Sequence, residues 1–257
     1  MPWFDAGVNL FDDRMPAEAT ISQAKQEGVE RLCLITTHPD EWSVAEQLYQ
    51  QYPDTLCYTL GIHPHHAKDA KPLHWDTLIT MAQSPGAVAI GECGLDYNRD
   101  FSPRQTQREV FEKQLSIAVQ LNKPVYLHER EAFGDQCALL NRYMPTLPGG
   151  IAHCFTGNVK EMQSYLALGL YIGITGWLCD EKRGEALREA VLSLPLDKLI
   201  LETDAPYLYP KTRKPRQRNN APAFLPHVGH ALATLINQPV ENVEMTSYKN
   251  SIALFNL

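Results

Sequence analysis

Short apolar, β-branched segments recur along this 257-residue chain, and longer stretches with a helical pattern separate them. The segments start on average about 28 residues apart, which is the length of one βα unit. Near-continuous apolar segments of this kind are typical of parallel strands that helices cover on both faces. We therefore expect eight strands, over residues 3–10, 31–37, 57–65, 87–96, 124–129, 151–155, 170–175 and 199–206.

Capping residues mark several of the helices expected between these strands. Ser102, which precedes a proline, predicts the N-cap of one helix. Asn158 and Glu161 predict a capping box at the start of another helix, and Gly169 predicts its end. Gly28 predicts the end of the first helix in the same way. Because no linker-like segment interrupts the alternation, we expect a single domain over residues 1–257.

Two architectures contain eight alternating strands and helices, the closed (β/α)8 barrel and the open doubly wound sheet. The open sheet predicts a glycine-rich phosphate turn after an early strand, and neither GxGxxG nor GxxxxGK[ST] occurs in the sequence. The length is near that of one α/β barrel, and polar residues gather at the ends of the expected strands. A barrel directs all of these side chains into one mouth. The pattern therefore predicts a (β/α)8 TIM barrel.

The charge balance and composition restrict the classes of function. The formal net charge is −7, so the surface as a whole does not coat nucleic acid, and any polyanion must meet a local basic patch. The first residues carry no secretion signal, and no apolar segment is long enough to span a bilayer. The six cysteines form no CxxC pair, so we expect them to be reduced. These features predict a cytoplasmic protein that does not bind membranes.

Two histidines follow expected strands at places where a core residue is typical. His128 follows Pro-Val-Tyr-Leu, and His153 follows Gly-Ile-Ala. A single histidine at such a place is more often a hydrogen-bonded core residue. Two on successive strands, with Glu92 on the preceding strand and Asp204 on the last, favour a metal site. Imidazole and carboxylate together suit Zn²⁺, Mn²⁺, Fe²⁺ or Mg²⁺.

Three of the carboxylates at the expected strand ends are candidates for the site. Glu92 lies between glycines that allow close approach of a ligand, and a buried carboxylate there needs a cation or donors. A core salt bridge with Arg130 is the alternative interpretation. Glu202 and Asp204 are two residues apart and share a strand face, where a cation or one protonated member relieves their repulsion. We interpret Asp204 as metal ligand and base for the attacking water, and Glu202 as an acid or a group that orients a ligand.

Further residues near the expected mouth are candidates for substrate contact. His63 and His65 show the same two-residue spacing, which suggests proton transfer by His63 and phosphate binding by His65, with a plain polar loop as the alternative. Arg130 would neutralise phosphate charge. The segment 211–218 carries five cations in eight residues and follows the strand of Asp204. It predicts a phosphate guide or, alternatively, a solvated loop. Its candidate substrate-binding residues are Arg213, Lys214, Arg216 and Arg218.

Five motifs in this order resemble those of the TatD family of metal-dependent deoxyribonucleases, and the match covers essentially the whole chain. They are Gly-Ile-His63-Pro-His65, Gly-Glu92-Cys-Gly-Leu-Asp96-Tyr, Pro-Val-Tyr-Leu-His128-Glu-Arg130, His153-Cys-Phe-Thr-Gly157 and Leu-Glu202-Thr-Asp204-Ala-Pro-Tyr. The resemblance implies an amidohydrolase-like barrel and a divalent metal, preferably Mg²⁺, with Mn²⁺ or Zn²⁺ as alternatives. It also implies 3′→5′ exonuclease action on single-stranded DNA or RNA, with metal ligands at Glu92, His128, His153 and Asp204.

Two segments depart from the family pattern. Most members have Asp-x-His-x-His in the first strand, where this chain has Asp5-Ala-Gly7-Val-Asn9, a departure that it shares with the bacterial TatD branch. The metal that the two histidines would hold is therefore in question. The family also usually has Asn-Glu-Pro after the last barrel strand, where this chain has Ala221 in place of the glutamate. That change removes a carboxylate from the mouth.

The predicted reaction is the hydrolysis of a phosphodiester bond at the 3′ end of a single strand, by a monomer. A cation held by Glu92, His128 and His153 would bind a phosphate oxygen and activate a water that Asp204 orients or deprotonates. Two other functions stay open at this point. One is another hydrolase of the same barrel, such as a D-aminoacyl-tRNA deacylase. The other is a non-catalytic binder of phosphate ligands.

Overall fold

The computed structural model describes residues 2–257, and Met1 lies outside them. Eight parallel strands in this part of the chain form one sheet, in which each strand pairs with the next in sequence order. The strands are β1 (Trp3–Val8), β2 (Val29–Leu34), β3 (Leu56–Leu60), β4 (Ala87–Asp96), β5 (Val125–Arg130), β6 (Gly150–Ala152), β7 (Tyr171–Ile174) and β8 (Leu199–Leu201).

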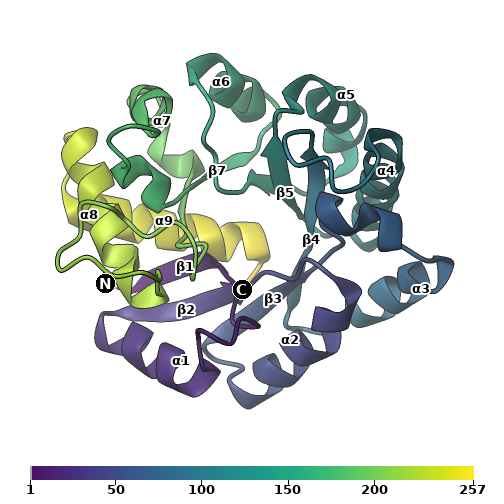
Figure 1. The fold of residues 1–257 in the computed structure, drawn as a ribbon, viewed down its shortest axis with the longest axis horizontal. Coiled ribbons are helices and arrows are strands. Elements are labelled where there is room, and N and C mark those ends of the chain that lie inside the picture. The colour runs from purple at the N-terminus through teal and green to yellow at the C-terminus, as the bar shows by residue number, and fades with distance from the viewer. Residues whose placement is uncertain (1) are drawn as a thin grey trace.

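Helices surround this sheet, and each of the first seven follows the strand of the same number (Figure 1). The α-helices between residues 2 and 257 are α1 (Ala17–Gln26), α2 (Pro39–Gln51), α3 (Pro72–Met81), α4 (Arg104–Leu121), α5 (Phe133–Tyr143), α6 (Val159–Ala167), α7 (Glu185–Val191), α8 (Leu225–Leu235) and α9 (Val240–Phe255). Short 3₁₀ helices connect some of them, namely η1 (Pro64–Asp69), η2 (Met144–Thr146), η3 (Gly176–Cys179), η4 (Leu196–Lys198) and η5 (Pro222–Phe224).

The last strand returns to the first and closes the sheet. Val8 forms a parallel bridge with Ala205, and the backbone N–H of Asp204 donates to the carbonyl of Gly7 at 2.9 Å. The buried Asp5 carboxylate reinforces this seam, because it accepts hydrogen bonds from the backbone and the hydroxyl of Thr203 at 2.8 and 2.5 Å. The predicted (β/α)8 barrel is confirmed, and the open-sheet alternative is wrong.

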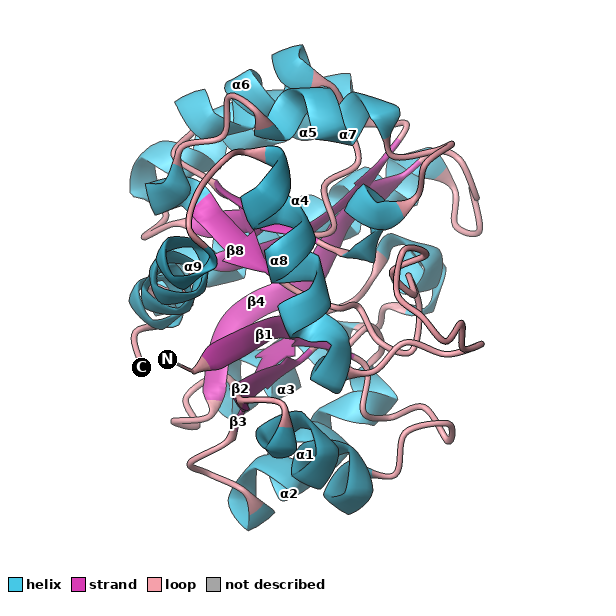
Figure 2. Ribbon diagram, turned by 90° about the vertical axis from the view of Figure 1, so that its left-hand side faces the viewer, coloured by secondary structure: helices cyan, strands magenta, loops and turns pink. Residues whose placement is uncertain are grey.

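The apolar core has two layers that the alternation of strand residues creates. Outward-facing residues pack under the helices, and a separate interior cluster fills the barrel. Helix α9 contributes Leu254 and Phe255 to the interior cluster, and the Phe255 ring lies 5.8 Å from that of Phe4 on β1. In Figure 2, α9 lies on the side where β1 begins, and the long loops gather at the opposite end. The amino end of the barrel is therefore plugged, which leaves the carboxyl end for a site.

The local predictions have mixed outcomes. Gly28 and Gly169 have positive φ angles of 78° and 83° just beyond α1 and α6, and the capping box of Asn158 and Glu161 is present, so these predictions are confirmed. The predicted N-cap at Ser102 is wrong. Helix α4 begins at Arg104, after Pro103 as the cap residue. The Ser102 hydroxyl instead accepts from the N–H of Lys68 and donates to the carbonyl of His65.

Several expected strands are shorter in the structure than their apolar patterns indicated. Strand β3 ends at Leu60 and β8 ends at Leu201, so the polar residues that follow belong to loops. All six cysteines are free. Between residues 2 and 257, no helix has the length and apolar character needed to cross a bilayer. The single domain over residues 1–257 stays a prediction, and its first residue lies outside the described part.

Candidate active site

A cavity of about 880 Å³ opens at the carboxyl ends of the strands. Its floor carries polar side chains from β4 and from the loops or strand ends after β3, β5, β6 and β8. These five strand ends meet only because the barrel is closed, since the chain separates the first and last of them by more than half its length. The candidate catalytic and metal-ligating residues that line the cavity are His63, Glu92, His128, His153 and Asp204.

Glu92 is the centre of this group. Its Oε1 lies 2.9 Å from Nδ1 of His128, 3.5 Å from Nε2 of His63 and 4.0 Å from Nε2 of His153. The side chain is only 8% exposed, so its charge depends on these neighbours rather than on water. Among residues 2–257 Glu92 forms no ion pair with Arg130, so the salt-bridge alternative is wrong.

His128 has a carboxylate on each side of its ring. Nδ1 faces Glu92, and Nε2 lies 3.2 Å from Oδ2 of Asp96 at the end of β4. The same Asp96 oxygen lies 2.7 Å from Nε2 of His65. A metal-binding imidazole typically donates its second N–H to a carboxylate, which fixes the ring and increases its basicity. The environment of His128 has this form.

His153 is held from below by two buried groups. Its Nδ1 lies 2.5 Å from Oε2 of Glu202 and 2.7 Å from the hydroxyl of Tyr126. The other Glu202 oxygen accepts a hydrogen bond from the N–H of Cys154 at 2.7 Å. Because Nδ1 of His153 donates to Glu202, Nε2 on the other side of the ring points toward Glu92 and Asp204. Glu202 is fully buried and does not line the cavity, which favours the interpretation that it orients a ligand.

Asp204 reaches the cavity through a turn rather than along a strand. Strand β8 has ended at Leu201, and Asp204 adopts a left-handed conformation with a φ of 54°, which aspartate tolerates better than most residues. Its Oδ1 accepts a hydrogen bond from Asn9 at 3.0 Å and lies 3.9 Å from Nε2 of His153. Of the two predicted carboxylates after β8, Asp204 therefore lines the cavity, and Glu202 lies beneath it against His153.

Two of the imidazoles that face carboxylates, His128 and His153, favour the protonated form. Burial opposes their charge, but hydrogen bonds to Asp96 and Glu92 raise the pKa of His128 to about 9. Burial likewise opposes the charge on His153, and Glu202 raises its pKa to about 10. Protons on these rings thus neutralise a carboxylate-rich floor, and a cation that binds there must displace them.

The other titratable groups of the floor respond to the same charges. Burial, together with the neighbouring His128 ring, lowers the pKa of His63 to about 4. Burial opposes ionisation of Glu92, but His63 and His128 lower its pKa well below the usual value. Burial raises the pKa of Asp204 to about 6, against the attraction of His153. Glu92 therefore stays ionised beside neutral and cationic rings.

The donor atoms fit a divalent cation. Two groups of side chains each place all their donor atoms within 4.8 Å of one another, namely His63 with Glu92 and His128, and His153 with Cys154 and Asp204. Carboxylate oxygens and imidazole nitrogens suit the divalent metals of hydrolytic sites. The cavity above them leaves room for water or substrate at an open coordination position.

The predicted substrate-binding residues lie in two places. His65 and Arg130 line the cavity, and no ion pair of Arg130 occurs among the described residues. The segment 211–218 follows Tyr207 and Leu208, which line the cavity. Within the described part of the chain, no cation of this segment belongs to the cavity lining. Arg213 packs its guanidinium 3.6 Å from the centre of the Phe224 ring. The cations left exposed in this segment are Lys211, Lys214, Arg216 and Arg218.

The sequence pattern of the TatD-related DNase family matches residues 4–256. The chain belongs to this family. Two similar TatD-family proteins are both named 3′-5′ ssDNA/RNA exonuclease TatD. The one from Erwinia tasmaniensis is 43% identical over 258 residues, which cover 99% of this chain and 100% of the relative. The one from Pantoea vagans is 42% identical over 258 residues, which cover 99% of each chain.

Solved TatD-family structures have the same fold. A TatD homologue from Escherichia coli K12 matches with a TM-score of 0.91 at 25% identity, over 99% of this chain and 98% of that chain. A TatD-family hydrolase from Entamoeba histolytica matches with a TM-score of 0.89 at 23% identity, over 99% and 98%. An uncharacterised amidohydrolase from Saccharomyces cerevisiae matches with a TM-score of 0.88 at 19% identity, over 99% of this chain and 100% of that chain. The predicted amidohydrolase-like barrel is confirmed.

The structure gives a physical reason for one departure from the TatD-family pattern. A Cβ added at Gly7 would collide with the Tyr126 hydroxyl and lie 2.7 Å from Oε2 of Glu202. These two groups fill the space that a side chain at position 7 would need. Asn9 lines the cavity and contacts Asp204 instead of offering an imidazole. Ala221 is half-buried and does not line the cavity of the described chain.

Sequence reasoning gave no site role to three residues that the structure places in this TatD-family site. Asp96 orients His128, Tyr126 contacts His153, and Asn9 contacts Asp204. Asp96 and Tyr126 both stood in motifs that resemble those of the family, so a signal for each existed. Tyr126 lay inside an apolar strand, where a tyrosine is ordinary, and its role depends on partners far away in the sequence.

Proposed function

We propose that this chain is a divalent-metal-dependent exonuclease that removes nucleotides in the 3′→5′ direction from single-stranded DNA or RNA. The observation that carries the proposal is the position of Glu92. One of its carboxylate oxygens, Oε1, faces His63, His128 and His153 at the floor of the cavity. The names of the relatives supply the substrate class and the polarity. Mg²⁺ is the proposed ion, and Mn²⁺ and Zn²⁺ are alternatives that imidazole donors also accept.

In this proposal the cation is held by Glu92, His128, His153 and Asp204. Other side chains of the site fix the two histidine rings in place. When bound, the cation supplies a Lewis acid that neutralises a phosphate oxygen and lowers the pKa of water. The carboxylates of Asp96 and of Glu202 fix the two rings, so little reorganisation is needed when substrate arrives.

Asp204 is the proposed acceptor of the proton from the attacking water. Asn9 donates to Oδ1 of Asp204, which lines the cavity, and Oδ2 stays able to accept that proton. His63 presents Nε2 to the same floor, because its Nδ1 accepts a hydrogen bond from the N–H of His65 at 3.1 Å. It is the proposed contact for the leaving oxygen.

The shape of the cavity supports action at a chain end. Helix α9 plugs the barrel at the amino end, so the cavity has one opening and no through-channel. A single-stranded terminus can enter such a pocket, whereas an internal bond of a duplex cannot. Fraying a duplex end costs about 1.4 kcal/mol per base-pair step, so we expect duplex DNA to be degraded slowly.

End-labelled oligonucleotides test the proposal. With Mg²⁺ or Mn²⁺, a 5′-labelled single strand should give a descending ladder, and a strand with a blocked 3′ end should resist. Excess chelator should stop the reaction, and added metal should restore it. Cleavage of a circular single strand, or a ladder that requires a free 5′ end, would contradict exonuclease action from the 3′ end.

The same assay distinguishes the other functions considered from the sequence. Hydrolysis of D-aminoacyl-tRNA with both oligonucleotides intact would support a deacylase in place of the nuclease. Binding of single strands without turnover at any metal would support a non-catalytic binder. The monomeric state and the cytoplasmic location stay predictions, which sedimentation and cell fractionation can check.

A further inference from the structure

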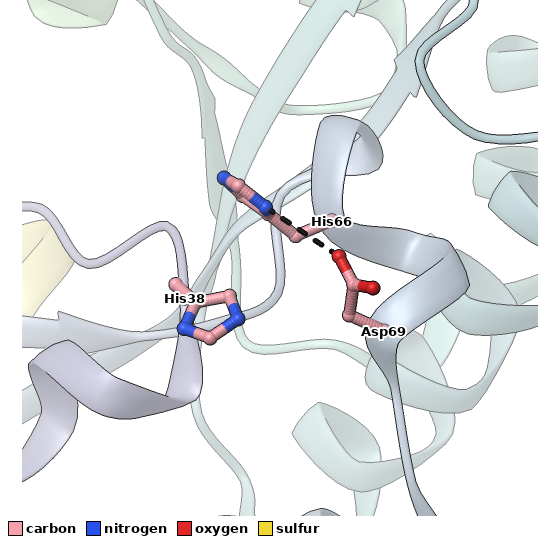
Figure 3. A group of neighbouring side chains, drawn as sticks. All are labelled: His38, His66 and Asp69. Carbon is pink, nitrogen blue, oxygen red and sulfur yellow. Dashed lines mark ion pairs between the residues drawn. The ribbon is translucent and has the colours of Figure 1, made fainter.

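A third group of side chains that could hold a metal ion lies at the edge of the cavity, where His66 is part of the lining. His38 is the N-cap of α2, after β2, and His66 and Asp69 belong to η1, after β3. Their donor atoms lie within 4.8 Å of one another, and the rings of His38 and His66 are 5.0 Å apart in an edge-to-face arrangement. Figure 3 shows the three side chains converging from the two segments. We call this group the rim cluster.

Nε2 is the ring nitrogen of His38 that would bind an ion. In the structure Nδ1 accepts from the N–H of Asp40 at 3.2 Å, so the neutral ring carries its proton on Nε2. The Asp40 carboxylate lies 3.3 Å from the same Nδ1. When Nε2 binds a cation, the ring proton moves to Nδ1, which then loses the hydrogen bond from the Asp40 N–H and can donate to the Asp40 carboxylate instead. This carboxylate–histidine pairing is the one that supports metal-bound imidazoles in many proteins.

His66 and Asp69 have the freedom to complete a site. Oδ2 of Asp69 lies 3.9 Å from Nδ1 of His66, and the two side chains are 42% and 49% exposed. Two donors bound to one tetrahedral Zn²⁺ lie about 3.3 Å apart, since each bond is about 2.0–2.1 Å long. Half-exposed side chains can close that difference by small rotations.

We propose that the rim cluster binds a divalent transition metal of the Zn²⁺ class, separately from the cation at the cavity floor. Two imidazoles with one carboxylate select Zn²⁺, Ni²⁺ or Cu²⁺ over Mg²⁺, which prefers oxygen ligands. The rim cluster shares no residue with either floor group. Three protein ligands leave one coordination position for water or a phosphate oxygen, and His66 lines the cavity that a substrate would enter.

The bound ion would add a link between two segments that already share a backbone hydrogen bond, from the N–H of His63 to the carbonyl of Thr37. It would tie the start of α2 to η1, and η1 begins directly after His63 and carries His65. Both of those residues contact carboxylates of the floor. The rim ion would therefore stabilise the position of η1 relative to the floor. This inference concerns metal binding alone and does not rest on the proposed nuclease activity.

Histidine side-chain NMR of the full chain identifies the ligands without any substitution. Zn²⁺ is added stepwise to the metal-free protein, and two-bond ¹⁵N–¹H correlations follow each imidazole. We expect the signals of His38 and His66 to change together as one equivalent of Zn²⁺ binds. If only His63, His128 and His153 respond up to saturation, or if the rim responds only at millimolar Zn²⁺, the rim site does not exist.

Equilibrium dialysis of variants provides the second measurement. The double variant His38→Asn/Asp69→Asn should bind one Zn²⁺ fewer than the unmodified chain, because asparagine keeps the N-cap but is a poor zinc ligand. His230→Asn is the control, since His230 is an exposed histidine of α8 outside every metal-ligating group of the described residues. It should bind as much Zn²⁺ as the unmodified chain. Equal binding by all three proteins would overturn the proposal.

Discussion

The hydroxyl of Tyr126 lies 2.5 Å from Oε2 of Glu202, and together these buried groups hold one ring nitrogen of His153. The same hydroxyl fills the space beside Gly7 in β1. The chain therefore supports His153 with a tyrosine from β5 and a glutamate after β8, while the first strand contributes no imidazole. The floor of this site therefore depends on the contact between these two residues, for which Gly7 of β1 leaves the space.

Tyr126→Phe should weaken the activating metal without unfolding the barrel. The substitution removes one hydrogen bond to Glu202 and leaves the ring, so His153 is held less firmly. Loss of a group that supports a metal-binding histidine typically costs 10–100-fold in metal affinity. Activity measured against metal concentration should show this shift. Tyr58→Phe, which removes a buried hydroxyl outside the site, is the control. An unchanged metal requirement would argue against the role of Tyr126.

Glu92→Gln should lower kcat by about 100-fold or more, because the centre of the proposed metal site loses its charge. Glu129→Gln is a matched control, since Glu129 lines the same cavity and belongs to none of the metal-ligating groups between residues 2 and 257. Circular dichroism should show an intact fold for both. If Glu92→Gln keeps more than about a tenth of the activity at saturating metal, Glu92 is not a ligand that the reaction requires.

Neutralising the exposed part of the 211–218 segment tests whether it guides the substrate. Replacing Lys214, Arg216 and Arg218 with glutamine should raise KM and flatten its dependence on salt. On a single strand, the log–log salt slope decreases by about 0.7 for every phosphate that the protein no longer neutralises. The control replaces three exposed lysines outside the cavity lining, Lys25, Lys113 and Lys249. The same slope in both variants would mean that the segment is a solvated loop.

Tyr207→Ala should raise KM for single strands. Tyr207 lines the cavity and is 50% exposed. The Arg14 guanidinium lies over one face of its ring, 5.0 Å from the ring centre, so the opposite face is available to a base. Base stacking on an aromatic ring contributes about 1–3 kcal/mol, which corresponds to a change of about 5- to 150-fold. Tyr207→Phe should restore binding, and Leu192→Ala, at an exposed site elsewhere, should have no effect. Equal KM values in all variants would exclude stacking at Tyr207.

The Asp5 carboxylate predicts a pH dependence of stability. Burial raises its pKa from 3.8 to about 7, although hydrogen bonds from Thr203 oppose this change. The folded chain therefore keeps this proton where the unfolded chain has lost it. The contribution to stability is fully present below about pH 4, falls as the pH rises to about 7, and is constant above that value.

Denaturant unfolding of the unmodified chain and of Asp5→Asn isolates this effect. The free energy of unfolding of the unmodified chain, minus that of Asp5→Asn, should fall by up to about 1.4 kcal/mol per pH unit between pH 4 and 7. Subtracting the variant removes the contributions of the histidines and other carboxylates, which both proteins share. A difference that stays constant across this window would show that Asp5 titrates normally.

The spacing and content of the apolar segments were sufficient to predict the barrel and its candidate ligands. Glu92, His128 and His153 each interrupt or follow an apolar strand, and parallel strands place their carboxyl ends together. A local pattern could therefore locate them. It could not place Ser102, because the hydroxyl gains more from its contacts with the η1 segment than from capping α4.

Only the tertiary structure decided which groups support the ligands. Tyr126 has the pattern of an ordinary strand residue, and its partner Glu202 lies 76 residues away; Asn9 and Asp204 are 195 residues apart. The residues of the rim cluster follow different strands, and neither segment alone suggests a site. A strand pattern specifies which residues alternate in and out. Which inward groups meet depends on the closure of the barrel and the register between strands, because these set the distances that hydrogen bonds and metal ligands require.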